Sequence, residues 1–178
     1  MRYVALLRGI NVGGHAKISM ADLRGLMDSL GHTEVRTLLQ SGNALFTSPR
    51  DNRTELTGEI EQAITSGLGL RVSVLLRTGD ELAALVEENP FPNGMALPTH
   101  LHVSFLSDQP DSERLSGIDM RRFEPDEFRI GDRAIYLWYP NGAGRTKLSN
   151  DFFERRLGLT ATARNWNTVT KLLDLTTS

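Results

Sequence analysis

The stretch 88-ENPFPNGMALPTH-100 divides this sequence of 178 residues into two halves, and the order of elements on either side of it decides the fold. It holds three of the seven prolines together with a glycine, a composition typical of a linker. The predicted domain boundary therefore lies close to residue 90. One unit is expected over residues 1–89 and the other over residues 90–178.

Outward from the linker, the N-terminal half has the pattern of strand, helix, two strands, helix, strand and a final helix. Apolar residues that alternate with polar ones indicate the strands. The helices begin where a capping residue precedes apolar residues at helical spacing. The predicted elements are strands over 3–8, 34–40, 43–47 and 72–76, and helices that follow Ser19, Asn52 and Thr78.

The C-terminal half repeats this order of elements without repeating the sequence. Each half therefore has the order β-α-β-β-α-β followed by a helix, the ferredoxin-like arrangement. We predict an α+β protein of two ferredoxin-like subdomains in tandem. The elements of the second half are strands over 100–106, 128–130, 134–139 and 160–164, a hairpin turn at Gly131–Asp132, a short helix after Ser107, a helix from Ser149 to Gly158, and a last helix capped by Asn165 or Asn167.

Composition narrows the class of protein. Hydrophobic residues make up 39% of the chain and charged residues 24%, which is typical of a globular domain. The absence of cysteine excludes disulfides and metal–thiolate sites. No apolar stretch approaches the roughly 20 residues of a membrane span. The opening MRYVALLRG breaks off at Arg8, too early for a signal peptide, so we expect a cytoplasmic protein without a membrane association.

The charge is unevenly distributed, although the net charge is only −2. Residues 1–50 and residues 145–178 are each net +3, whereas residues 51–144 are net −8. The two basic ends could form one positive surface if the fold brings them together. The alternative is scatter, because these differences are small.

Topology predicts where the polar segments meet. In a ferredoxin-like sheet the first two strands are parallel, so the loop 9–17 and the turn 40–43 lie at one edge of the first sheet. In the second half, the third and fourth strands end together, which places Arg145 and Lys147 near the segment 164–168. If these edges face each other, four segments converge on a cleft between the halves, a common place for a ligand.

The residue types in these segments are suited to an anion. Glycine lets backbone N–H groups approach closely, and such groups together with a helix N-terminus bind phosphate. Arginine and lysine add charge, and asparagine can orient a ligand. The candidate ligand-binding residues are Arg8, Asn11, Gly13, Gly14, Lys17, Ser41 and Asn43 in the first half, and Arg145, Lys147, Arg164, Asn165, Asn167 and Thr168 in the second.

Each of these residues also has a purely structural interpretation. Gly42 and Asn43 can simply form a hairpin turn, and Asn165 can be only a helix cap. Gly13–Gly14 can be a flexible connection, and Arg145 can be part of a solvated face. The hypothesis of a site therefore depends on the predicted convergence rather than on a single residue.

Several chemical motifs are incomplete in this sequence. GINVGGHAK lacks the glycine–lysine pair of a phosphate-binding Walker loop, and its glycines stand too far before a helix for a dinucleotide fingerprint. His100 and His102 share a strand face, but no third metal ligand is evident. Ser41 has no histidine partner, and His15 is more typical of a mobile surface residue. We therefore expect no metal and no cofactor.

Five stretches together resemble the domain of unknown function 1697 family of bacterial proteins. The resemblance implies ferredoxin-like subdomains and brings no established substrate or reaction. It implies that the motif positions are Arg8, Asn11, Gly13, Gly14, Ser41, Gly42, Asn43, Lys147, Arg164, Asn165, Trp166 and Thr168, and that His15 and Ala16 vary. The stretches are YVALLRGINVGG (3–14), SMADLRGLMDSLG (19–31), QSGNALF (40–46), KLSNDFFERRLG (147–158) and TARNWNTVTKLL (162–173).

The leading hypothesis is a protein that binds a phosphate-bearing small molecule or nucleotide in the predicted cleft. One alternative is a nucleic-acid-binding protein, for which Tyr136 and Trp138 on one strand could stack on bases, although packing against a helix is their more usual role. Another is a structural or partner-binding module without a ligand. The sequence leaves open whether a reaction is catalysed, since no general base can be named.

Overall fold

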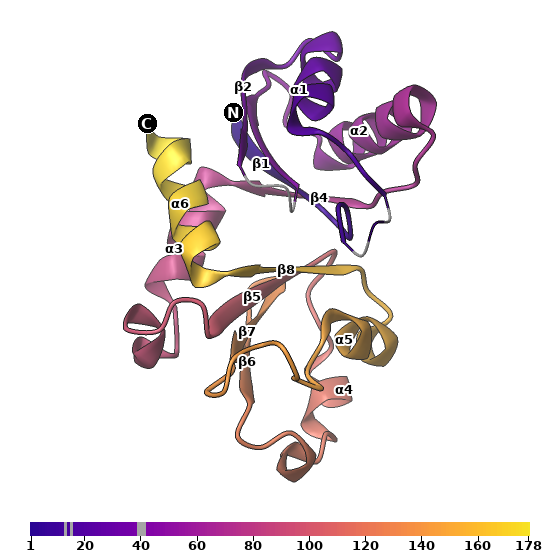
Figure 1. Cartoon of the computed structure of the whole chain (residues 1–178). Coiled ribbons are helices and arrows are strands. Elements are labelled where there is room, and N and C mark those ends of the chain that lie inside the picture. The colour runs from indigo at the N-terminus through magenta and orange to yellow at the C-terminus, as the bar shows by residue number, and fades with distance from the viewer. Residues whose placement is uncertain (13, 15, 39–41) are drawn as a thin grey trace. The chain divides into compact units, whose positions relative to one another are not determined.

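The computed structural model describes residues 1–12, 14, 16–38 and 42–178, and these fold into two compact units (Figure 1). The first unit comprises Met1–Leu82 together with Leu172–Ser178, and the second comprises Ala83–Lys171. Each contains a four-stranded antiparallel sheet with helices. The predicted α+β class with two similar subdomains in tandem is therefore confirmed.

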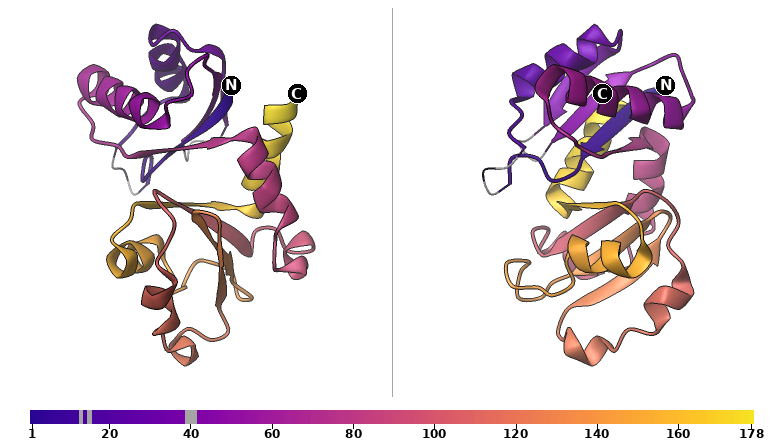
Figure 2. Two further views of the ribbon diagram at one scale, coloured as in Figure 1. Left: turned by 180° about the vertical axis from the view of Figure 1, so that it is seen from behind. Right: turned by 90° about the vertical axis from the view of Figure 1, so that its right-hand side faces the viewer.

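The first unit has the predicted order of strands and helices. Its sheet has the strand order β2-β3-β1-β4, and all three pairings are antiparallel. Figure 2 shows α1 and α2 on one face of this sheet. The elements are β1 (Arg2–Leu7), α1 (Met20–Ser29), β2 (Thr33–Leu38), β3 (Asn43–Thr47), α2 (Arg53–Leu68), β4 (Val74–Thr78) and α3 (Gly79–Glu87).

Local capping fixes where these helices begin, as the sequence predicts. Ser19 accepts a hydrogen bond from Asp22 N at the start of α1, and Asn52 accepts one from Glu55 N at the start of α2. At α3, Thr78 N donates to Glu81 Oε2 over 2.8 Å while Glu81 N donates to Thr78 Oγ1 over 3.3 Å. This reciprocal pair is a capping box.

The second unit repeats the plan. Its strand order is β6-β7-β5-β8, again with antiparallel pairings only. Its helices α4 and α5 lie on one face of the sheet (Figure 2). The elements are β5 (Leu101–Leu106), α4 (Ser112–Ser116), β6 (Glu127–Gly131), β7 (Ala134–Trp138), α5 (Asn150–Leu157), β8 (Ala161–Asn165) and α6 (Trp166–Thr177), with short 3-10 turns at Pro92–Met95 and Met120–Arg122.

Two details of the second unit differ from the sequence prediction. The short helix α4 is capped by Asp111 rather than by Ser107, whose side chain instead accepts a hydrogen bond from Thr160 N over 3.0 Å. The hairpin turn between β6 and β7 lies at residues 132–133, because Gly131 still pairs with Ala134. Both differences arise because several turn-forming residues follow one another there, and local preference alone does not choose among them.

The units are divided inside helices rather than at the linker. The first division falls between Leu82 and Ala83 within α3, and the second between Lys171 and Leu172 within α6. The predicted boundary between residues 89 and 90 follows α3 instead. A prolyl linker marks a break in secondary structure, whereas a compact unit is defined by the packing of side chains, so the two positions need not coincide.

Corresponding positions in the two sheets follow from the strand register. Val4 on β1 lies between Leu45 and Arg77, and Val103 on β5 lies between Tyr136 and Arg164. The helix-facing core of the first unit contains Tyr3, Ala5 and Leu7 of β1. On β5 the equivalent positions carry His102, Ser104 and Leu106. The second unit thus places a histidine and a serine where the first has a tyrosine and an alanine.

No helix in the described part of the chain is both long and apolar enough to cross a membrane.

Candidate anion-binding site

In the first unit, the loop after β1 and the turn before β3 lie at the same edge of the sheet. Leu7 N donates to Gly42 O over 2.9 Å, and Asn43 pairs with Leu6. Arg8 follows directly and its backbone N donates to Ser73 O over 2.9 Å. The structure therefore places Arg8 and Asn43 close together.

The Asn11 amide closes the loop that follows β1. Its Nδ2 donates to Ile18 O and its Oδ1 accepts from Ile18 N, each over 2.9 Å. The loop also carries positive φ angles at Gly9, Asn11, Gly14 and Ala16. Positive φ at Ala16 is unusual for a residue with a β-carbon. The Asn11 side chain holds this loop by hydrogen-bonding the backbone of Ile18, seven residues further along the chain.

Asn43 has a comparable structural task. It is fully buried, and its Nδ2 donates to Leu38 O over 2.8 Å, which joins the start of β3 to the end of β2. The side-chain amides of Asn11 and Asn43, both predicted to orient a ligand, thus bind the protein's own backbone. Gly13, His15 and Ser41 lie outside the described residues.

A shallow depression of about 390 Å³ lies beside this loop, at the N-terminus of α1. It is lined by Asn11, Gly14, Lys17, Ile18 and Ser19. Lys17 supplies a positive charge at its rim. Asp22 in the first turn of α1 supplies a negative charge nearby, which weakens the attraction of this helix end for an anion.

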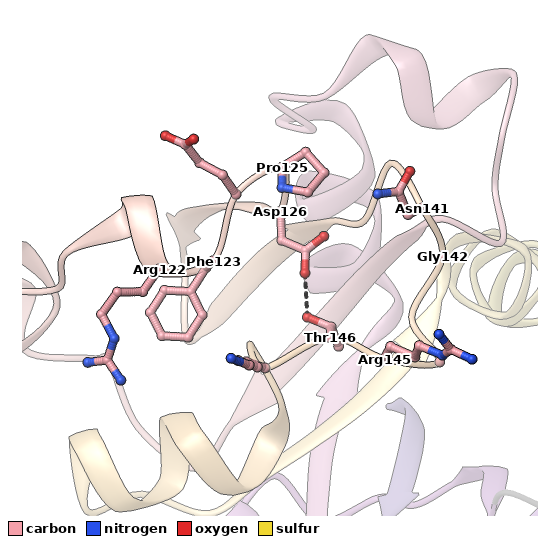
Figure 3. A pocket seen from close by; sticks show the side chains of 11 residues that line it. Arg122, Phe123, Pro125, Asp126, Asn141, Gly142, Arg145 and Thr146 are labelled. Carbon is pink, nitrogen blue, oxygen red and sulfur yellow. Dashed lines mark hydrogen bonds between the residues drawn. The ribbon is translucent and has the colours of Figure 1, made fainter.

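The second unit holds a larger pocket of about 740 Å³, formed by residues 122–126 and by turn residues 141, 142 and 144–147 (Figure 3). We refer to it as the second-unit pocket. Three of its lining residues are cations, namely Arg122, Arg145 and Lys147, and two are carboxylates, Glu124 and Asp126. Among the described residues none of the three cations forms an ion pair. Arg122 lies over the ring of Phe123, with 5.8 Å between the guanidinium carbon and the ring centroid.

The floor of this pocket is ordered by a short hydrogen-bond chain. Leu148 N donates to Thr146 Oγ1 over 3.0 Å, and Thr146 Oγ1 donates to Asp126 Oδ2 over 2.7 Å. Leu148 is fully buried, and its carbonyl accepts from Tyr139 Oη over 2.7 Å. Burial, and after it the charge of Asp126, raises the pKa of Tyr139, so the phenol remains a donor. Asp126 is thereby linked to the core of the unit.

The predicted residues at the start of α6 do not line this pocket. Arg164 is only 6% exposed, and its Nη1 donates to Thr162 Oγ1 over 2.7 Å and to Ala163 O over 2.9 Å. Burial lowers the pKa of Arg164 to about 10. Asn165 Oδ1 accepts from Thr168 N over 3.0 Å as the cap of α6, while Asn167 is exposed.

The two histidines on β5 have separate surroundings. His100 Nδ1 lies 3.1 Å from Pro140 O, and the ring of His102 packs against Tyr139 with 5.2 Å between centroids. Burial, followed by the charge of His100, lowers the pKa of His102 to about 4. The described residues contain no group of three histidine or carboxylate side chains that could hold a metal ion.

Comparisons with known proteins address the family and the fold. The family model described as "Protein of unknown function (DUF1697)" matches residues 1–136. The chain belongs to this family. A search of curated proteins found no match.

One solved structure resembles this DUF1697 protein along almost its whole length. It is described as the structure of conserved bacterial protein SP0830 from Streptococcus pneumoniae. The two share 22% sequence identity and a TM-score of 0.74, over 99% of this chain and 98% of the other. At this identity the likeness establishes a shared fold.

Of the residues that line the second-unit pocket, only Arg145 and Lys147 were named as candidates from the sequence, and Arg122, Asp126 and Thr146 were missed among others. Arg122 and Asp126 lie within the part of the chain that the DUF1697 model matches, whereas Arg145 and Lys147 lie beyond it. Topology could have pointed to Asp126, because β6 begins beside the end of β7: Glu127 pairs with Trp138. The hydrogen bond between Thr146 and Asp126 joins residues 20 positions apart, so no local pattern in the sequence predicts it.

A second omission is Arg77, the counterpart of Arg164. It is 4% exposed, and its Nη1 donates to Leu76 O over 2.8 Å, just as Arg164 binds the carbonyl of the residue before it. The two arginines occupy the same register position in their sheets. A position-by-position alignment of the two halves by their strand order would have paired them.

Proposed function

We propose that this is a cytoplasmic protein that binds a phosphate-bearing small molecule or nucleotide in the second-unit pocket. The observation that carries the proposal is the presence of three cationic side chains, without ion-pair partners among the described residues, around one pocket of about 740 Å³. A pocket of this size falls within the range of small-molecule sites. The predicted cleft between the halves stays a prediction.

The layout of the charges favours an elongated ligand over a single compact ion. Arg122 and Arg145 lie on opposite sides of the pair formed by Asp126 and Thr146 (Figure 3). A guanidinium can grip a phosphate with two parallel hydrogen bonds. One arginine would hold the phosphate of such a ligand, and the remainder of the molecule would extend across Asp126.

The turn that closes the pocket supports an anion as well. Gly142 has a φ of +84°, and its N donates to Tyr139 O over 2.9 Å. A turn with a positive φ at glycine exposes neighbouring backbone N–H groups, which bind anions. Lys147 follows in the same connection between β7 and α5 and adds a compact charge.

Nucleic-acid binding is the weaker alternative. Tyr136 is 2% exposed and Trp138 is 8% exposed, and the Tyr136 hydroxyl donates to Leu85 O over 2.6 Å. Buried rings offer no platform on which bases could stack. Binding to single-stranded nucleic acid should weaken steeply with salt, and a small-molecule complex should weaken far less.

The proposal is tested by a thermal-shift screen of nucleotides and sugar phosphates, followed by titration calorimetry of any hit. The variant Arg145→Ala/Lys147→Ala should lose most of the affinity. Arg155→Ala is the matched control, because Arg155 is an exposed arginine of α5 outside the pocket. The proposal fails if no compound stabilises the protein, or if the control weakens binding as much as the double variant does.

A further inference from the structure

The second-unit pocket contains a carboxylate at a place where a site built only for phosphate would avoid one. Asp126 lies between Arg122 and Arg145 (Figure 3). A carboxylate repels a phosphate, so its presence there weakens the binding of a simple phosphate ion. Asp126 is half-buried, and the hydrogen bond from Thr146 fixes its orientation in the pocket.

The hydrogen-bond chain determines which oxygen of Asp126 is engaged. Thr146 donates to Oδ2, and Leu148 N in turn donates to Thr146. Among the described residues no hydrogen bond reaches Oδ1. An ionised carboxylate accepts hydrogen bonds only, so Oδ1 is available to accept one from a donor such as a hydroxyl group.

We infer that Asp126 is a specificity-determining residue that accepts a hydroxyl of the ligand, which makes sugar phosphates and nucleotides the preferred class. The inference rests on the proposed function, since it concerns the same pocket. Arginine binds the phosphate, and Asp126 binds a hydroxyl of the sugar joined to it. Hydrogen bonds to a charged group discriminate strongly against a ligand that lacks the donor, because the carboxylate is then left unpaired.

Two phosphomonoesters of equal charge measure this contribution. Ribose 5-phosphate carries hydroxyl groups and ethyl phosphate carries none. We define the preference ratio as the Kd for ethyl phosphate divided by the Kd for ribose 5-phosphate, both from titration calorimetry on the same protein. One hydrogen bond to the carboxylate predicts a preference ratio of about tenfold or more.

The Asp126→Asn variant should lower the preference ratio severalfold, because a neutral amide oxygen accepts a hydroxyl more weakly than a carboxylate does. Ethyl phosphate should bind as tightly as before or more tightly, because a repelling charge has been removed. Glu113→Gln is the matched control, since Glu113 is an exposed carboxylate of α4 outside the pocket, and it should leave the ratio unchanged. An equal fall of the ratio in both variants overturns the inference.

Thr146 provides an independent variant in case Asp126→Asn does not fold. Thr146→Val removes the hydroxyl that orients Asp126 and should lower the preference ratio, whereas Thr146→Ser keeps the hydroxyl and should restore it. A ratio near 1 in the unmodified protein overturns the role of Asp126 while leaving phosphate binding intact. If neither ester binds, the proposed function fails, and the role of Asp126 fails with it.

Discussion

The two units share one strand order but carry their long polar loops at different connections. In the first unit the long connection follows the first strand, over residues 8–19, while residues 48–52 join β3 to α2. In the second unit residues 107–111 join β5 to α4, and the long connection follows β7, over residues 139–149. The repeated scaffold therefore does not repeat a site, and each unit must be tested by itself.

The largest expected effect is on the free energy of unfolding, and it should differ between two glycines with similar φ angles. Gly42 and Gly142 have φ angles of +88° and +84°. A β-carbon at Gly42 would lie 2.6 Å from Ile10 Cδ1, whereas one at Gly142 would meet no atom within 4 Å. Gly42→Ala should lower the free energy of unfolding by about 4 kcal/mol, and Gly142→Ala by about 1 kcal/mol.

Urea unfolding of both variants measures these differences. Equal losses of stability would mean that backbone conformation alone governs both turns and that the packing around Gly42 has no effect.

The paired arginines test whether the two sheets are equivalent in energy. Arg77→Ala and Arg164→Ala should each cost about 3 kcal/mol, because a buried side chain is deleted and its acceptors lose their donor. Methionine fills much of the space without the cost of burying a charge, so Arg77→Met and Arg164→Met should each cost about 1 kcal/mol. Thermal and urea unfolding provide the comparison. A large loss of stability at only one of the two positions would show that the two arginines are not equivalent in energy.

Acid should destabilise the protein through His102, whose counterpart in the first unit is the uncharged Tyr3. Burial lowers the pKa of His102 to about 4, below its ordinary value of 6.5. From pH 7 to pH 5 the unfolded chain therefore gains a proton that the folded chain does not bind. The free energy of unfolding should fall by about 2 kcal/mol over this range.

Urea unfolding at a series of pH values gives this slope. His102→Phe should make it shallower and leave the part due to His32, whose pKa burial also lowers, while His100→Phe should retain most of it. An unchanged slope in His102→Phe would assign the acid sensitivity to other groups.

The smallest effect concerns one lysine from each long loop. Lys17 and Lys147 are both exposed, so replacing either by alanine should change the free energy of unfolding by less than about 0.5 kcal/mol. Their effect on binding should differ. Lys147→Ala should weaken ribose 5-phosphate about fivefold, as the loss of one partly screened charge implies, and Lys17→Ala should not. The reverse result would move the proposed site to the first unit.

Much of the fold could be predicted from local sequence. Ser19, Asn52 and Thr78 cap the helices that they were predicted to cap, because an N-cap needs only a side chain and a backbone N–H two or three residues away. The start of α4 was wrong because Asp111 offers the same local chemistry as Ser107. Strand order followed from the succession of elements.

The task of each polar residue was harder to predict. Asn11 donates to the Ile18 carbonyl and Asn43 to the Leu38 carbonyl, so amides that resembled ligand contacts bind the backbone instead. Asp126 meets Thr146 from a distant part of the chain. Such pairings depend on where the backbone places side chains in three dimensions, which neither periodicity nor composition records.

The first unit is built from two segments that lie far apart in the sequence, and this has a consequence for its synthesis. Residues 172–178 belong to it, although the whole second unit is translated in between. Nascent chains grow at about 5–20 residues per second, so residues 1–82 wait roughly 5 to 20 seconds for the helical turns that complete their unit. During that interval a folding chaperone has the opportunity to hold the nascent first unit.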